Sequence, residues 1–164
     1  MKANFRKQAG VTLTELILAI ALIAVLATVS VLLLDPQEKR AKARDNRRIS
    51  DLTTLDRSIN EYLLDTGNYP DAPLTLRDST TLPPGGIALD RSADGWIDAN
   101  LSTYTSHLPL DPINDSTYRY YYYRDTNGYE LNAVIEFLTA DAANDGGNDP
   151  ARYEMGNKLD LISP

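Results

Sequence analysis

A single carboxylate interrupts the longest apolar stretch of the sequence. Residues 11–34 contain 24 side chains, of which only Glu15 is charged. A carboxylate costs free energy inside a bilayer, less near the end of a helix than at its centre, so a buried one is expected to have a partner. The alternative is that Glu15 lies at headgroup level and marks the edge of the span. Only the first interpretation gives Glu15 a chemical role, that of pairing with a positive charge.

A second group of oxygen ligands lies near the C-terminus, where residues 141–149 read DAANDGGND. Calcium takes about six to eight oxygen ligands from carboxylates, amides and carbonyls, and glycines allow a sharp turn. The spacing is not that of an EF-hand, and a plain acidic loop is the simpler interpretation. The candidate calcium ligands are Asp141, Asn144, Asp145, Asn148 and Asp149.

Other chemistries have little support in the sequence. Cysteine is absent and His107 is the only histidine, which excludes disulfides, thiolate sites and histidine-rich zinc sites. There is no nucleophile elbow, phosphate loop or metal cluster, so we expect no enzyme. The net charge of −7 argues against nucleic acid as a partner.

The apolar stretch predicts a transmembrane helix over residues 11–34, because about 20 apolar residues cross a bilayer core. Lys2, Arg6 and Lys7 precede it and favour a cytoplasmic N-terminus. However, residues 39–48 carry six basic side chains, more than the leader does, so the flanking charges alone would favour the opposite orientation.

A second helix is expected over residues 35–66, after a break at Asp35-Pro36. Its apolar side chains recur at three- and four-residue steps, and Gly67 should end it. We interpret the basic cluster of residues 39–48 as a solvated mixed face; the alternative is contact with lipid headgroups or with acidic surfaces of neighbouring subunits. The predicted apolar face consists of Ile49, Leu52, Leu55, Ile59 and Tyr62.

Residues 67–164 should form an acidic globular part. A loop with short strands near 86–89 and 96–97 is expected first, then a short helix at 101–107. Asn127-Gly128 predicts a hairpin between strands at 118–124 and 129–137, and a last strand is expected at 152–155 or 158–162. Tyr129, Leu131, Ala133, Ile135 and Phe137 should cover the helix while Glu130, Asn132, Val134 and Glu136 face water. The predicted class is α+β, a long helix packed on a small antiparallel sheet.

The motif Gly10-Val-Thr-Leu-Thr-Glu15, after a basic leader and before the apolar run, resembles the processing site of type IV prepilins and type II secretion pseudopilins. This resemblance implies that a prepilin peptidase removes residues 1–10 after Gly10. It also implies N-methylation of Val11, where the family usually has phenylalanine. Glu15 would neutralise the N-terminal ammonium of a neighbouring subunit during assembly.

The passage from Asn60 to Pro70 and the strand Gly128-Tyr-Glu-Leu resemble G-type pseudopilins, in which calcium holds the C-terminal loop, although the spacing here differs. The resemblance implies a pilin-like fold and a homo-oligomeric filament, a type IV pilus or a type II secretion pseudopilus. It also implies minor pilins, an assembly ATPase and a platform membrane protein as partners. The chain would be anchored in the inner membrane, with its C-terminal part outside the cytoplasm. The alternative is a permanently anchored protein with a partner- or calcium-binding domain.

Overall fold

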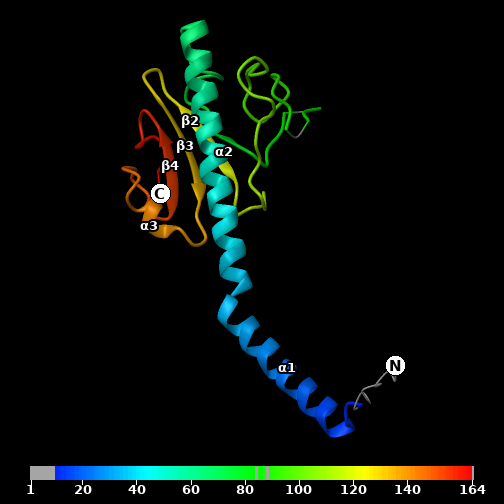
Figure 1. The fold of residues 1–164 in the computed structure, drawn as a ribbon. Coiled ribbons are helices and arrows are strands. Elements are labelled where there is room, and N and C mark those ends of the chain that lie inside the picture. Colours follow the sequence, from blue (N-terminus) through cyan, green and yellow to red (C-terminus); the bar gives the residue numbers. More distant parts are fainter. Residues whose placement is uncertain (1–9, 84, 88, 164) are drawn as a thin grey trace, which may run out of the picture. The chain divides into compact units, whose positions relative to one another are not determined.

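The computed structural model describes residues 10–83, 85–87 and 89–163 (Figure 1). The predicted leader therefore lies outside the described residues, except for Gly10. The chain forms two compact units, Met1–Lys39 and Arg40–Pro164. Seven elements follow one another, from α1 to β4, and the predicted α+β class is confirmed.

The first unit contains α1, Leu13–Leu34, which is long and apolar enough to cross a membrane. No part of the span Leu13–Ser30 is buried within the chain. The hydroxyls of Thr28 and Ser30 donate to the carbonyls of Ala24 and Leu26, four residues earlier. These polar groups are therefore satisfied inside the helix, as an apolar surrounding requires.

The predicted break between the two helices is confirmed at Asp35, whose φ of 30° is left-handed. Pro36 begins α2, Pro36–Thr66, at the first helical position, where a missing N–H costs nothing. The carboxylate of Asp35 accepts the N–H groups of Gln37 and Glu38, both at 3.2 Å. α2 thus starts with its own cap, and it ends before Gly67, whose φ is +73°.

The second unit packs α2 on a four-stranded antiparallel sheet of order β1-β2-β3-β4 (Figure 1). The strands are β1 (Arg77–Asp78), β2 (Tyr120–Arg124), β3 (Tyr129–Val134) and β4 (Arg152–Gly156), and a short helix, α3 (Thr139–Ala142), precedes β4. The β2–β3 hairpin turns where predicted, because the carboxylate of Asp125 accepts the N–H groups of Asn127 and Gly128. The last strand was expected at 152–155 or 158–162, and β4 occupies the first of these positions.

The core lies between α2, the sheet and the long loop before β2. The apolar face of α2 was predicted well, since Leu52, Leu55 and Ile59 are fully buried. Trp96 fills the core, and its Nε1 donates to the carbonyl of Pro109 at 3.1 Å. The same cluster includes Ile97, Leu101, Leu108, Tyr120, Tyr122, Tyr129, Leu131 and Ala133.

Two local predictions in the long loop were wrong. The described residues of 86–89 and 96–97 form no strand, because backbone groups there close tight turns, such as Gly86 N–H to the carbonyl of Pro83 and Ala99 N–H to the carbonyl of Ile97. The strand that extends the sheet is β1. The expected helix at 101–107 is only a turn, in which the amide oxygen of Asn100 accepts Ser102 N–H.

The outer face of β3 was predicted to be solvated, and this was also wrong. Glu130 and Asn132 are fully buried, and the carboxylate of Glu130 accepts the N–H groups of Leu161 and Ile162 at 2.8 and 2.9 Å. Glu154 of β4 is also buried on this face, and burial, with help from Glu130, raises the pKa of Glu154 to about 7. The C-terminal segment therefore covers this face of the sheet.

A fully buried guanidinium joins α2 to two distant segments. Arg48 pairs with Asp45 at 2.8 Å, with Asp111 at 2.6 Å and with Glu136 at 2.6 Å. Asp45 also accepts the backbone N–H groups of residues 136, 137 and 138. The ring of Tyr118 lies 4.8 Å from the guanidinium carbon and closes the site. Part of the basic cluster is therefore structural and not a solvated face.

Replacing Arg48 by methionine should destabilise the second unit by about 3–5 kcal/mol, because it leaves the buried carboxylates of Asp45 and Asp111 without their cation. The measurement is urea unfolding of a fragment starting at Gln37, followed by circular dichroism. Arg57→Met is the matched control, since Arg57 pairs only with Glu61 at the surface and should cost about 1 kcal/mol or less. Equal losses in the two variants would contradict the structural role of Arg48.

Candidate processing and assembly site

The predicted cleavage bond, Gly10–Val11, lies just before the helix in exposed chain. Both residues are exposed and non-helical, and the next residue, Thr12, has an extended backbone with φ −78° and ψ 153°. A protease requires an accessible bond outside regular structure, and this bond meets both conditions. A Cβ at Gly10 would meet no atom within 4 Å. The fold itself thus does not require glycine at this position, so any requirement would come from the peptidase.

Thr12 is the N-cap of α1, a role that was not predicted from the sequence. The Thr12 hydroxyl accepts Glu15 N–H at 3.2 Å, and the Glu15 carboxylate accepts Thr12 N–H at 2.9 Å. This reciprocal pair is a capping box. Its signal was visible in the sequence as a threonine followed three residues later by glutamate, just before an apolar run.

The capping box gives Glu15 a structural role in addition to the charge pairing expected from the sequence. One oxygen, Oε2, accepts both the N–H and the hydroxyl of Thr12, each at 2.9 Å. The carboxylate is therefore held against the first turn of α1, where the helix dipole favours negative charge. The Thr12 N–H that it accepts belongs to the residue next to Val11, whose nitrogen cleavage would convert into an ammonium. A cation arriving at this helix end would meet a carboxylate that is already oriented.

The rest of α1 offers an apolar surface on all sides. Leu16, Ile17 and Leu18 are successive residues and all are more than half exposed, so they cannot lie on one face. A helix of this kind needs apolar surroundings on every side, either lipid or other helices. The described residues of the first unit provide no such apolar surroundings for the span Leu13–Ser30.

The candidate calcium ligands do not converge in the structure. Asp145 accepts the N–H groups of Gly147 and Glu154, and Asp149 pairs with Arg152 at 3.0 Å. Asp141, Asn144 and Asn148 are exposed. Within the described ranges, no group of three His, Cys, Asp or Glu side chains is placed to hold a metal ion. Calcium binding by this loop stays a prediction.

That prediction has a direct test. If calcium holds the loop, a chelator should lower the melting temperature of a fragment starting at Gln37, since a ligand at 100 times its Kd stabilises by about 2.7 kcal/mol. Asp141→Asn should weaken the response, because it removes an exposed candidate ligand. If the chelator leaves the melting curve unchanged, calcium does not stabilise this loop.

Comparison with known proteins supports the sequence motif. Residues 5–31 match the family model described as the prokaryotic N-terminal methylation motif. The chain is 32% identical to type II secretion system core protein G of Escherichia coli (strain K12) over 109 residues, 65% of this chain and 67% of that protein. The corresponding protein of Aeromonas hydrophila is 31% identical over 108 residues, 65% of this chain and 68% of that one.

The chain belongs to the type II secretion core protein G family. A third member, from Vibrio cholerae, is 26% identical over 154 residues, 94% of each chain, so the likeness extends through the globular unit. No solved structure gives a significant match. The chain is thus a G-type pseudopilin-like subunit with an N-methylation motif, from a structural and non-enzymatic family.

Proposed function

We propose that a prepilin peptidase cleaves this pseudopilin between Gly10 and Val11, that Val11 is then methylated, and that the mature chain assembles into a pseudopilus. The observation that carries the proposal is the exposed, non-helical Gly10–Val11 bond just before a capped apolar helix. The match to the N-methylation motif over residues 5–31 supports it independently.

In the proposed assembly, α1 moves from lipid into the core of a filament made of many copies. Both surroundings are apolar, so the helix that is exposed on all sides in one chain is suited to each. Glu15 then pairs with the Val11 ammonium of a neighbouring subunit. Two opposite charges in a low dielectric attract strongly, while each is costly to bury alone, so the pair would favour one register between subunits.

The apolar helix and the family together indicate anchoring in the inner membrane before assembly. Beyond that, we infer that residues 40–164 lie outside the cytoplasm. The partners inferred for this chain are further copies of itself, minor pseudopilins, an assembly ATPase and a platform membrane protein.

Co-expression with a prepilin peptidase should shorten the chain by residues 1–10, and the intact mass of the membrane-extracted protein measures this directly. Expression without the peptidase is the control and should preserve the full mass. If the mass is unchanged with an active peptidase, the chain is not a substrate. A permanently anchored protein with a binding domain would then be the better interpretation.

Substitutions at Glu15 can separate its charge from its capping bond. Glu15→Val removes both, while Glu15→Gln retains an oxygen that can accept Thr12 N–H but has no charge. We expect both variants to be cleaved largely normally and both to assemble poorly, as seen by counting filaments in electron micrographs.

Normal filaments from Glu15→Val would contradict the charge-pairing role. If Glu15→Gln forms normal filaments and Glu15→Val does not, assembly requires the hydrogen bond from Thr12 N–H to residue 15 and not the charge of Glu15.

A further inference from the structure

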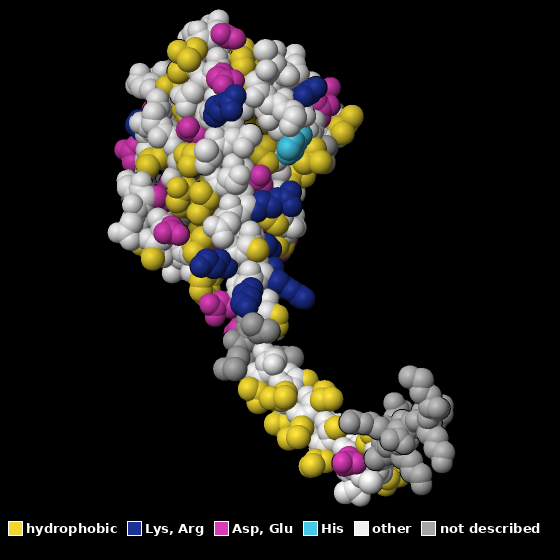
Figure 2. Space-filling model, viewed as in Figure 1, with side chains coloured by type: hydrophobic (Ala, Val, Ile, Leu, Met, Phe, Trp, Pro, Cys, Tyr) yellow, Lys and Arg dark blue, Asp and Glu magenta, His cyan; other side chains and the backbone are white. Residues whose placement is uncertain are grey.

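The outward face of the first turns of α2 is cationic. Between residues 36 and 50 the exposed charged side chains are Lys39, Arg40, Lys42 and Arg47, with Glu38 as the one exposed carboxylate among these described residues. Asp45, the other acidic residue of this segment, is turned inward and fully buried. Figure 2 shows Lys and Arg side chains gathered over these turns.

Three of these cations differ from their neighbours in having no ion-pair partner among the described residues. Arg44 pairs with Glu136 and Arg48 is enclosed by carboxylates. Arg47 lies 3.5 Å from Asp51. For Lys39, Arg40 and Lys42, the described part of the chain provides no ion pair. We call these three residues the basic collar.

The position of the basic collar along the chain matches the depth of lipid headgroups. Its members lie five, six and eight residues beyond Leu34, the last residue of α1. At about 1.5 Å per helical residue this is roughly 8–12 Å of chain, whatever the direction of α2. The headgroup layer extends about 5–8 Å beyond the hydrocarbon core, and Lys and Arg side chains reach further along their apolar stems.

Orientation signals do not account for these cations. Positive charge is favoured on the cytoplasmic side of a span, and the proposed topology places the basic collar on the opposite side.

We propose that the basic collar binds anionic phospholipid headgroups while the chain is anchored in the membrane. This inference rests on the proposed anchoring by α1. The diffuse negative charge of a lipid surface needs no preformed pocket, which suits three exposed and flexible side chains. Release of these contacts would accompany extraction of the subunit into a filament.

The test uses the full-length chain reconstituted in phosphatidylcholine bilayers that contain traces of spin-labelled phosphatidylglycerol or phosphatidylcholine. The spectrum of the motionally restricted lipid gives the relative association constants. One cation near an anionic surface changes association about 5-fold, so the wild-type chain should prefer phosphatidylglycerol by at least about 5-fold. The preference should decrease in high salt.

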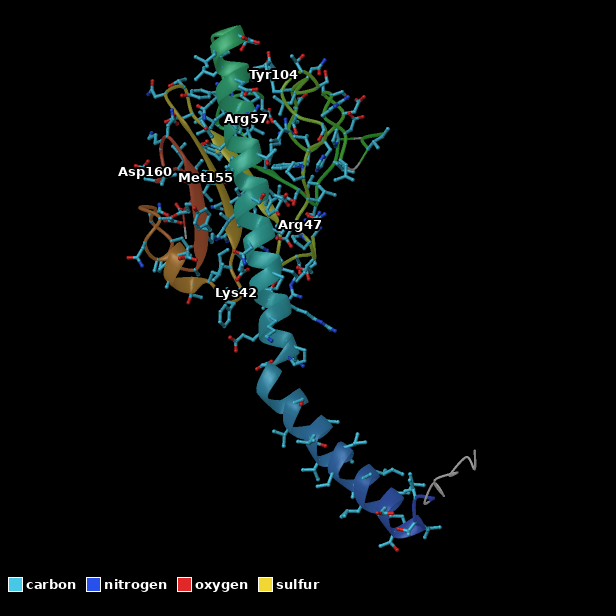
Figure 3. All side chains as sticks on the ribbon, in the orientation of Figure 1. Lys42, Arg47, Arg57, Tyr104, Met155 and Asp160 are labelled. Atoms are coloured by element: carbon cyan, nitrogen blue, oxygen red, sulfur yellow. The ribbon has the colours of Figure 1, made fainter. Side chains whose placement is uncertain are left out.

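The chain offers a matched control on the same helix. Lys39→Gln/Lys42→Gln should reduce the preference to about 2-fold or less, whereas Arg47→Gln/Arg57→Gln should retain it. Both double variants remove two charges from exposed sites, but Arg47 and Arg57 lie 13 and 23 residues beyond Leu34. That is about 20 and 35 Å along a helix, beyond a Debye length of about 8 Å. Figure 3 labels Lys42, Arg47 and Arg57 in succession along α2.

Each other outcome overturns the proposal. No lipid preference in the wild type, or equal losses in both double variants, would exclude a specific basic collar. An unchanged preference in Lys39→Gln/Lys42→Gln, combined with reduced cross-linking between copies, would assign the collar to subunit contacts instead. Failure of the chain to float with neutral vesicles would show that the anchoring itself is wrong, before any lipid preference is measured.

Discussion

The second unit depends on the burial of one charged side chain. Arg48 lies on the core side of α2, and its partners come from the loop before β2 and from the segment after β3. Taking a guanidinium out of water is costly unless every donor finds an acceptor, and here three carboxylates supply them. Asp45 extends the arrangement, because it also accepts the backbone N–H groups of residues 136–138, shortly after β3. The register of α2 against the sheet is therefore specified by charge as well as by the apolar stripe.

The opposite condition applies to α1. Within the described residues, no part of its span Leu13–Ser30 is buried, and its one carboxylate is satisfied locally by Thr12. The helix therefore has its own cap, in which the N–H groups of Thr12 and Glu15 both find side-chain acceptors. What it lacks is an apolar surrounding, and the proposed filament supplies this with copies of the same helix.

Much of this architecture could be predicted from the sequence. Leu52, Leu55 and Ile59 recur with helical spacing, and Asn127-Gly128 marks a tight turn, so both signals are local. The burial of Glu130 and Asn132 could not be predicted, because alternation shows that a strand has two faces but not that a distant C-terminal segment covers the second. Arg48 was missed for a related reason, since Asp111 and Glu136 are 63 and 88 residues away. Thr12, in contrast, had a readable motif.

The independent cap of α2 affects how a subunit could leave the membrane. Because Asp35 satisfies the first N–H groups of α2, the helix does not rely on hydrogen bonds continued from α1. In the proposed assembly, α1 can therefore move from lipid into the filament core without unfolding the first turn of α2. The activation barrier to extraction would then come from α1 and its lipid contacts, and the globular unit could stay folded throughout, so that transfer and folding are kinetically separate events.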